Sequence, residues 1–286
     1  MKIKLDRDLV KSFISLASVI EARDPYTGGH TWRVSQYGGK LAQAAGLSSD
    51  EVFVVKLGGL VHDLGKIGIS DAILLKPDKL TDEEYATMQE HPRIGMELLS
   101  NHPLYPVVMP SVIEHHVRAD GKGYPKQMEG QPLTQIGKIT AIADAFDAMT
   151  STRPYRKGMP VEKAIAILES EKDKQFDGEL VSQFVALAKN GELDHILGHC
   201  GDERLMMTCH GCGPIVAPPK GANQGDHVAC PNCHGDFIIN RLDDNPELEW
   251  TGKMLSVYVP NVDQDAIEEF MVGVPDEIEL AGSTAL

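Results

Sequence analysis

Long apolar segments are absent from this chain of 286 residues. No apolar run approaches the roughly 20 residues that a helix needs to cross a bilayer. Residues 1–4 alternate with lysine and lead directly into charged positions, so they lack the apolar region of a signal peptide. We therefore expect no membrane association and a cytoplasmic location.

Basic residues are also scarce. The chain has 27 Lys and Arg against 42 Asp and Glu, which gives a formal net charge of -15. Without a long basic stripe, bulk binding to nucleic acid or to an anionic membrane is excluded. A small anionic ligand remains possible, but metal ions and a few local cations must hold it. The hydrophobic fraction of 42% suits a globular protein of one large or two modest domains.

Cysteine is absent before Cys200, and all five cysteines lie within residues 200–233. Four of them form two CxxC pairs separated by 17 residues, a spacing that predicts a structural four-cysteine zinc site of the zinc-ribbon kind, on Cys209, Cys212, Cys230 and Cys233. The run from Cys230 to His234 also fits a covalent c-type haem motif. Haem attachment would require export and would leave the first pair unused, so zinc is favoured.

Helical periodicity dominates up to about residue 190. Apolar spacing predicts helices over residues 8–23, 30–45, 111–117, 136–150, 160–169 and 179–188. Two capping boxes, Ser48-x-x-Glu51 and Thr81-x-x-Glu84, mark further helix starts. We predict a mainly α fold with three parts: a helical domain over residues 1–195, a small β-rich zinc-ribbon module over 196–245, and an acidic extension over 246–286.

Candidate metal ligands are spread along the helical part. His62 and Asp63 end an apolar run; imidazole suits transition metals, and the two oxygens of one aspartate can bridge two ions. Asp144 lies in an apolar helix, where an unpaired carboxylate is costly to bury and a metal ion would remove that cost. Asp147, one turn later, could support it. The full candidate set is His30, His62, Asp63, His91, His115, His116 and Asp144.

Each of these candidates alone has an ordinary alternative, such as a helix cap or a surface residue. The adjacent His115 and His116 point about 100° apart on a helix, so both can meet one ion only near a helix end. Together, five imidazoles and two carboxylates are the set that a two-metal site requires. Two ions about 3.5–4 Å apart would share Asp63 and a bridging hydroxide, and such a pair favours attack on a phosphorus centre.

Six stretches of the sequence carry most of these residues. They are Arg23-Asp24-Pro25-Tyr26-Thr27-Gly28-Gly29-His30, His62-Asp63-Leu64-Gly65-Lys66-Ile67-Gly68, His115-His116, Asp120-Gly121-Lys122-Gly123-Tyr124-Pro125, Ile142-Ala143-Asp144-Ala145-Phe146-Asp147-Ala148-Met149 and Arg153-Pro154-Tyr155-Arg156. On these motifs the chain resembles the HD-GYP subgroup of the HD superfamily of metal-dependent phosphohydrolases. The resemblance covers about residues 8–190.

The resemblance implies an HD-type helical bundle that hydrolyses the phosphodiester bonds of cyclic di-GMP to linear pGpG, GMP or both, by a metal-bridging hydroxide. It implies two divalent ions, iron or manganese. One ion would be held by His30, His62, Asp63 and Asp144, and the other by Asp63, His91, His115 and His116.

The resemblance also implies roles outside the ligand set. Lys66 would approach a phosphate or the leaving oxygen and act with Asp63 in catalysis. Substrate contacts are implied for a loop at the rim of the site and for two arginines that could grip a phosphate: Gly123, Tyr124, Pro125, Arg153 and Arg156. Guanidinium groups suit that role because their geometry matches phosphate oxygens.

Three departures from the family pattern leave alternatives open. Val117 stands where most members have Glu, Ala119 stands where a bulky aromatic is common, and Tyr26 stands where some members place a Glu that holds a third metal, so we expect two metals. The alternatives are a catalytically weak receptor for the dinucleotide, or a phosphodiesterase for another cyclic dinucleotide such as cyclic GMP-AMP. Since the first catalytic helix begins close to residue 1, regulation is expected from the C-terminal module, as a protein-docking or homo-oligomer contact.

Overall fold

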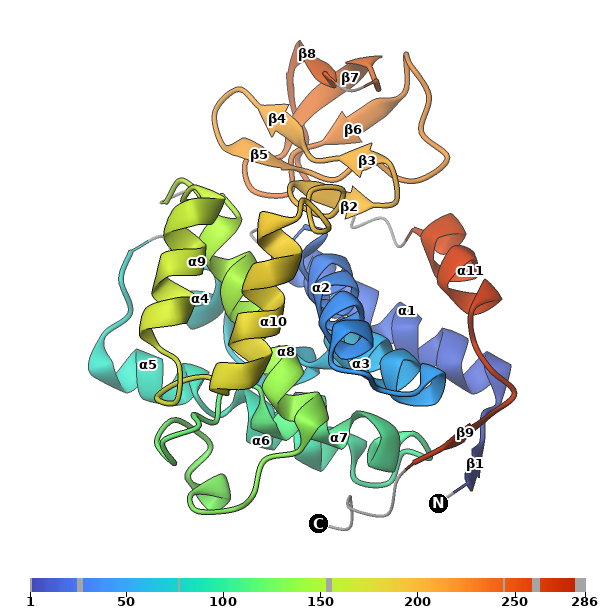
Figure 1. Cartoon of the computed structure of the whole chain (residues 1–286). Helices are drawn as coiled ribbons and strands as arrows, with labels where there is room; N and C mark the ends of the chain where they lie inside the picture. Colours follow the sequence, from blue (N-terminus) through green and yellow to red (C-terminus); the bar gives the residue numbers. More distant parts are fainter. Residues whose placement is uncertain are drawn as a thin grey trace.

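The computed structural model describes residues 2–24, 28–76, 78–152, 156–243, 245–258 and 263–280. A helical lobe carries a small β-rich module at one end, and the chain then returns along the outside of the helices (Figure 1). The helical lobe comprises α1 (Arg7–Arg23), α2 (His30–Ala44), α3 (Ser49–Val61), α4 (Asp71–Leu74), α5 (Asp82–Met88), α6 (His91–Leu99), α7 (Tyr105–Glu114), α8 (Gln135–Thr150), α9 (Val161–Ser170) and α10 (Gly178–Lys189), with 3₁₀ turns η1 (Leu64–Gly68) and η2 (Lys126–Met128).

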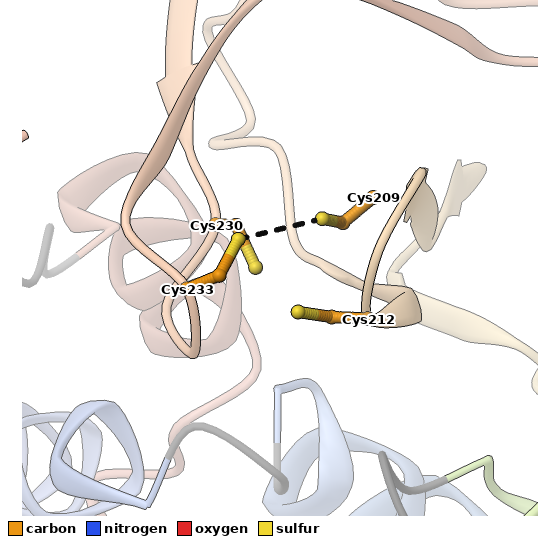
Figure 2. A group of neighbouring side chains, drawn as sticks. All are labelled: Cys209, Cys212, Cys230 and Cys233. Carbon is orange, nitrogen blue, oxygen red and sulfur yellow. Dashed lines mark hydrogen bonds between the residues drawn. The ribbon is translucent and has the colours of Figure 1, made fainter. Parts of the chain in front are cut away.

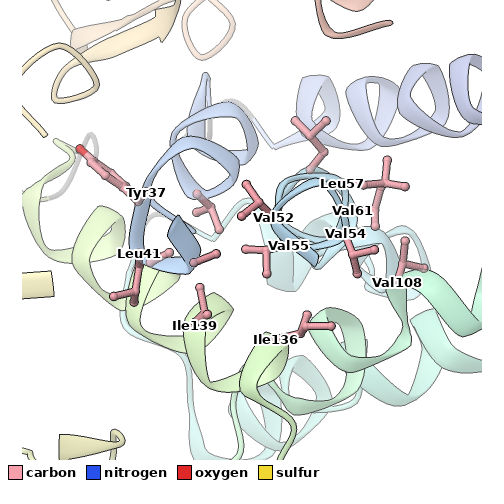
Figure 3. Packing of buried hydrophobic residues seen from close by; sticks show 14 of the residues in the cluster. Tyr37, Leu41, Val52, Val54, Val55, Leu57, Val61, Val108, Ile136 and Ile139 are labelled. Carbon is pink, nitrogen blue, oxygen red and sulfur yellow. The ribbon is translucent and has the colours of Figure 1, made fainter. Parts of the chain in front are cut away.

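Helix α3 is the centre of the helical lobe. It is buried on nearly every side and packs against α2, α7 and α8, as an apolar helix without a polar face must. Figure 3 shows its side chains meeting those of the surrounding helices, among them Leu41 of α2 and Ile139 of α8. The predicted capping box at Ser48 is present and fixes where α3 begins. The other end of α3 therefore delivers the next two residues, His62 and Asp63, into the interior.

The mainly α prediction is confirmed, and the helices predicted over residues 8–23, 30–45, 136–150, 160–169 and 179–188 are present with ends shifted by one residue at most. The helix predicted over residues 111–117 was wrong in its bounds. It starts at Tyr105 and runs through Pro110. Pro106 lies in the first turn, where a backbone N–H has no partner within the helix, so its missing N–H costs no hydrogen bond. Burial of Val107, Val108 and Val112 offsets the hydrogen bond that Pro110 cannot make.

The C-terminal module is built from short antiparallel pairs. Its strands are β2 (His199–Gly201), β3 (Arg204–Leu205), β4 (Met207–Cys209), β5 (Gly213–Val216), β6 (His227–Ala229), β7 (Gly235–Arg241) and β8 (Glu247–Met254). Strands β6, β7 and β8 form one sheet in that order, with Phe237 opposite Trp250. The sheet of the module therefore continues to Met254, beyond the predicted module end at residue 245.

The last described segment holds a helix that the sequence analysis did not anticipate. Helix α11 (Gln264–Val272) packs on α1, and β9 (Glu277–Glu279) pairs with β1 (Lys2–Lys4). Arg7 of α1 donates hydrogen bonds to the carbonyl oxygens of Met271 and, at 2.9 Å, Val274. The chain thus ties the far side of the module back to the first helix. Among the described residues, no helix combines the length and the apolar character needed to span a membrane.

The crossing of α2 and α3 gives a test of this packing. A Cβ atom on Gly59 would lie 2.7 Å from the Cα atom of Ser35, whereas one on Gly39 would meet only the side chain of Lys56. We expect Gly59→Ala to lower the free energy of unfolding by about 1–3 kcal/mol because backbone must move. The matched change Gly39→Ala should stay within about 1 kcal/mol of wild type, since alanine favours helix and Lys56 can swing aside. Denaturant unfolding of both variants measures the difference, and equal midpoints would contradict the close crossing.

Candidate metal centre

The seven predicted ligands come from five helices, and most of them stand at helix ends. His30 is the first residue of α2, His62 follows the last residue of α3, and His91 is the first residue of α6. His115 and His116 follow the end of α7, which is the placement that two adjacent histidines need to reach one site. The structure brings all seven together in three overlapping groups, each with its ligand atoms within 4.8 Å of one another: His91, His115 and His116; His30, His62 and Asp144; His62, Asp63 and His115.

Asp63 lies between the groups. Its Oδ2 atom is 3.6 Å from Nε2 of His30 and 3.4 Å from Nε2 of His62. Its Oδ1 atom is 3.3 Å from Nε2 of His91. The two oxygens of one carboxylate therefore face two different sets of imidazoles, the arrangement of a bridging ligand. Asp144 adds an oxygen 3.5 Å from Nε2 of His30 on one side only.

The hydrogen bonds of the rings show which nitrogen faces the centre. Nδ1 of His62, His91 and His115 lies 2.8 Å from the carbonyl oxygen of Gly59, Met88 and Ser111, respectively. A carbonyl can only accept, so each Nδ1 carries the hydrogen and each Nε2 presents a lone pair inward. This is how histidines are held when they bind a metal.

Two further observations show that a cation fits here. Within the part of the chain that the structure describes, the buried Nε2 atom of His62 has no hydrogen-bond partner. Nε2 of His91 and Nε2 of His115 lie 3.2 Å apart, although the carbonyl contacts leave both as acceptors. Converging lone pairs without donors are stabilised by a positive ion. Both the set of donor atoms and the unpaired lone pairs therefore fit a His/Asp metal-binding site.

Burial keeps most of these imidazoles neutral, as metal ligation requires. Desolvation lowers the pKa of His91 to about 3, lowers that of His115 far below its usual range, and lowers that of His116. His30 differs. Burial lowers its pKa, but hydrogen bonding to Asp147 and Asp63 raises it more, to about 9. The carboxylates around His30 therefore favour a positive charge at that position, whether a proton or a metal ion.

Asp147 supports His30 from behind. Its Oδ2 atom accepts a hydrogen bond of 2.8 Å from Nδ1 of His30, and Arg33 donates to Asp147 through Nε at 2.5 Å and Nη2 at 3.1 Å. Burial raises the pKa of Asp147, but Arg33 and His30 lower it far more, so the carboxylate stays ionised. Asp147 thus supports a candidate metal ligand through a hydrogen bond, as its place one turn after Asp144 suggested.

Lys66 lies beside the central carboxylate. Its Nζ atom is 2.6 Å from Oδ2 of Asp63 and 3.9 Å from Asp24. Desolvation raises the pKa of Asp63, but Lys66 and His62 reduce it more, so it lies well below its usual range. Arg23 donates to the carbonyl oxygens of Ile67 and Ile69 and so holds η1, the turn that carries Lys66.

The loop of Gly123, Tyr124 and Pro125 folds back over the end of α7. The amide of Tyr124 donates to the carbonyl of His116, and the two rings lie 4.5 Å apart between centroids, with a cis peptide bond before Pro125. Tyr124 therefore sits at the edge of the cluster. The backbone of Gly123 has φ +96 and its missing Cβ would clash with the His116 carbonyl, so only glycine fits.

Of the two arginines predicted to contact substrate, the structure describes Arg156. Arg153 and Tyr26 lie outside the described residues. Arg156 is exposed and donates a hydrogen bond to the carbonyl of Ala148 on α8. Val117, where the family pattern has Glu, is buried in a small apolar cluster with Met109, Ile113 and Met128, so an apolar residue suits that position.

The four predicted zinc ligands also converge. Sγ atoms of Cys209, Cys212, Cys230 and Cys233 lie within 4.8 Å of one another, and Figure 2 shows the two pairs facing each other from separate turns. Cys209 ends β4 and Cys212 precedes β5, while the second pair stands between β6 and β7. None forms a disulfide, and the amide of Asn232 donates to Sγ of Cys212. Cys200 lies apart, buried in β2.

The sequence analysis missed Arg33 and Asp24 as neighbours of the centre. An arginine three residues after a histidine is an ordinary helix residue, and its partner Asp147 lies 114 residues away. The backbone carbonyls that orient the histidines leave no mark in any sequence. Arg33 is only 4% exposed, and a buried arginine would have pointed to a functional role. That burial can be recognised only once the fold is known.

Comparison with known proteins agrees with this geometry. The cyclic di-GMP phosphodiesterase response regulator RpfG of Xanthomonas campestris pv. campestris is 39% identical over 185 residues, which cover 64% of this chain and 48% of that protein. A cyclic di-GMP phosphodiesterase of Thermotoga maritima is 41% identical over 171 residues, covering 59% of this chain and 46% of the relative. The 3'3'-cGAMP-specific phosphodiesterase 2 of Vibrio cholerae is 39% identical over 169 residues, covering 58% and 32%.

The chain matches less than half the length of each of these relatives. The family model of the HD domain matches residues 15–180, a span that contains all seven clustered His and Asp residues. Because this match extends over more than half of the sequence, the chain belongs to the HD domain family.

Proposed function

We propose that the helical lobe hydrolyses the phosphodiester bonds of cyclic di-GMP, to linear pGpG, GMP or both. The observation that carries this proposal is the buried carboxylate of Asp63, whose two oxygens face two sets of imidazoles. A pair of ions held in this way suits attack on phosphorus. The names of the relatives, cyclic di-GMP and cyclic GMP-AMP phosphodiesterases, support the class of substrate.

The ligands divide between two ions. His30, His62, Asp63 and Asp144 would hold one, and Asp63, His91, His115 and His116 would hold the other, in line with the groups that the side chains form. Neutral imidazoles and carboxylates accept iron or manganese, and we propose one of these. When bound, two such ions activate water as a hydroxide and offset the charge that develops on the phosphate.

The surrounding side chains then act on the substrate. Lys66, whose Nζ atom lies beside Asp63, would contact a phosphate oxygen or donate a proton to the leaving ribose oxygen. Tyr124, with Gly123 and Pro125, would form one wall against the dinucleotide, since its ring covers His116 at the edge of the cluster. Arg153 and Arg156 would bind the second phosphate, which requires Arg156 to leave the carbonyl of Ala148.

Two other functions are compatible with parts of the chain. A phosphodiesterase for cyclic GMP-AMP is favoured by the cGAMP-specific relative, whose identity of 39% equals that of RpfG. A catalytically weak receptor would be favoured by the changes at Val117 and Ala119. The complete set of inward-facing donors supports catalysis over that second alternative.

For the C-terminal module we propose one structural zinc on Cys209, Cys212, Cys230 and Cys233. All four thiols face one point, whereas covalent haem attachment would use only the second pair. Reduced thiols held for a metal suit a reducing compartment, so we propose a cytoplasmic location. Exposed Trp250, Met254 and Val257 support a role of the module in contacting a protein partner or a second copy of the chain.

The role of Asp63 can be tested by replacing it. Asp63→Ala should lower the turnover of cyclic di-GMP at least about a thousandfold, because both ions lose their shared ligand. It should also lower the metal content of protein purified without added ions or air. Asp8→Ala, an exposed carboxylate in the first turn of α1, is the control and should change neither value. Full metal content in Asp63→Ala would contradict the bridging role.

Base preference follows from rates measured side by side. The metal-loaded protein should hydrolyse cyclic di-GMP faster than the mixed guanine-adenine dinucleotide, and the adenine-only dinucleotide most slowly. Product analysis by chromatography then distinguishes pGpG from GMP. A higher rate with the mixed dinucleotide would select the cyclic GMP-AMP alternative. Two ions bound with no turnover of any of the three would select the receptor.

The zinc assignment predicts a difference between two cysteines. Cys230→Ser should release zinc, because a structural site needs all four thiolates, while the helical lobe keeps its circular dichroism. Cys200→Ser should retain zinc, since Cys200 lies outside the group of four. Metal analysis of both purified variants decides. Zinc retained in Cys230→Ser, or lost equally from both variants, would remove the assignment.

A further inference from the structure

Strand β2 of the C-terminal module lies directly on the turn that precedes His30. Gly29 has φ +70, and a Cβ atom there would be 2.6 Å from the Cα atom of Cys200 and 2.8 Å from its Cβ. Gly28, the residue before, lies against the side chain of Met206 and the carbonyl of Ile215. Three segments of the module therefore contact the two residues that precede α2. A residue with a side chain would not fit at Gly29.

Arg33 joins this contact to the metal centre. Nη1 donates to the carbonyl oxygen of His199 in β2 at 2.8 Å and to that of Gly28 at 3.1 Å. Nε and Nη2 of the same guanidinium donate to Asp147, which accepts from Nδ1 of His30. One planar group thus connects the backbone of β2 with the carboxylate that orients a metal ligand. Its exposure is only 4%, so water does not compete for these bonds.

Three other histidines of the cluster have Nδ1 hydrogen bonds that do not involve the module. His62, His91 and His115 each donate to a carbonyl three or four residues earlier in the chain. Their orientation is set within their own helix or turn. Among His30, His62, His91 and His115, His30 alone is oriented by a side chain, and that side chain is held by an arginine that also binds β2. The histidines of the two half-sites therefore differ in how they are oriented: His30 by the carboxylate of Asp147, and His91 and His115 by nearby backbone carbonyls.

We propose that strand β2 of the C-terminal module, acting through Arg33, sets the metal affinity of the half-site around His30. Arg33 is a positioning residue that acts through Asp147. The inference rests on the metal site of the proposed function and gives the module a defined role at that site. The half-site of His91, His115 and His116 keeps its affinity whatever the state of the module.

Manganese binding to the full chain tests this inference. Protein freed of active-site metal, with its zinc retained, is titrated with Mn²⁺ while free Mn²⁺ is followed by electron paramagnetic resonance. Wild type should bind two ions. Arg33→Lys keeps the charge but loses the fork that reaches both His199 and Asp147, and should weaken one of the two ions about 10–100-fold. The other ion should keep its affinity within about twofold.

A second variant perturbs the contact from the other side. Gly29→Ala should weaken the same ion, because β2 must move away from the start of α2. The matched control is Gly46→Ala at the opposite end of α2, where φ is +76 and nothing lies within 4 Å of the added Cβ. Both variants carry the strain of a left-handed alanine, and only the first displaces β2. Arg241→Lys, on an exposed arginine of β7, is the control for the charge-conserving change.

Combined variants assign the weakened ion. In protein that carries His91→Ala, the further change Arg33→Lys should abolish the remaining tight Mn²⁺ binding. In protein that carries Asp144→Ala, the same change should have no further effect on the ion that remains. Equal weakening of both ions, or unchanged affinity in Arg33→Lys and Gly29→Ala, would overturn the inference. The readout needs no dinucleotide, so two bound ions without hydrolysis would contradict the proposed function alone.

Discussion

A carboxylate that stays ionised inside a protein is the constraint on which the helical lobe depends. Asp63 is 8% exposed, and neighbouring cations hold its pKa well below the usual range despite burial. Lys66 supplies one positive charge, at one oxygen. The buried imidazoles of His91 and His115 are held neutral, so they offer lone pairs and no charge. A metal ion on either side of Asp63 would satisfy the carboxylate and the lone pairs at once.

This requirement explains the arrangement of the helices. Side chains within a helix point outward at fixed angles, whereas residues at helix ends can approach one point from several directions. His30, His62, His91 and His115 all stand at such ends, and the intervening apolar faces of α2, α3, α7 and α8 hold those ends in place. The close crossing of α2 and α3 at Gly59 is part of the same geometry, since it brings the start of one helix beside the end of the next.

Residue identity, periodicity and the family resemblance were enough to predict five helices within one residue and to single out the His/Asp and cysteine groups, because each depends on local pattern or on residues with few other uses in a buried position. What the sequence did not reveal is long-range. No sequence pattern links Arg33 with the carbonyl of His199, which lies 166 residues away. Every residue has a backbone carbonyl, so the sequence cannot show which one accepts a hydrogen bond. Helix α11 was overlooked because its acidic composition obscured the apolar spacing of Ile267, Phe270 and Met271. Pro110 led to a helix start predicted too late, after the proline. The helix in fact continues through Pro110, because burial of its neighbours offsets the hydrogen bond that the proline cannot make.

Among the described residues, the C-terminal module places no side chain in the His/Asp cluster, yet its first strand packs tightly against the turn before His30. Its apolar cluster is small, with Met207, Ile215, Phe237, Ile239 and Leu248 among its few members, so the proposed zinc would supply much of its stability. Coupling between two sites is reciprocal: if an ordered β2 raises the affinity of the His30 half-site, an ion bound there stabilises β2 on the helical lobe by the same free energy. If zinc on the four cysteines also orders β2, the proposed thiolate site and the proposed His/Asp site would be linked thermodynamically through the guanidinium of Arg33.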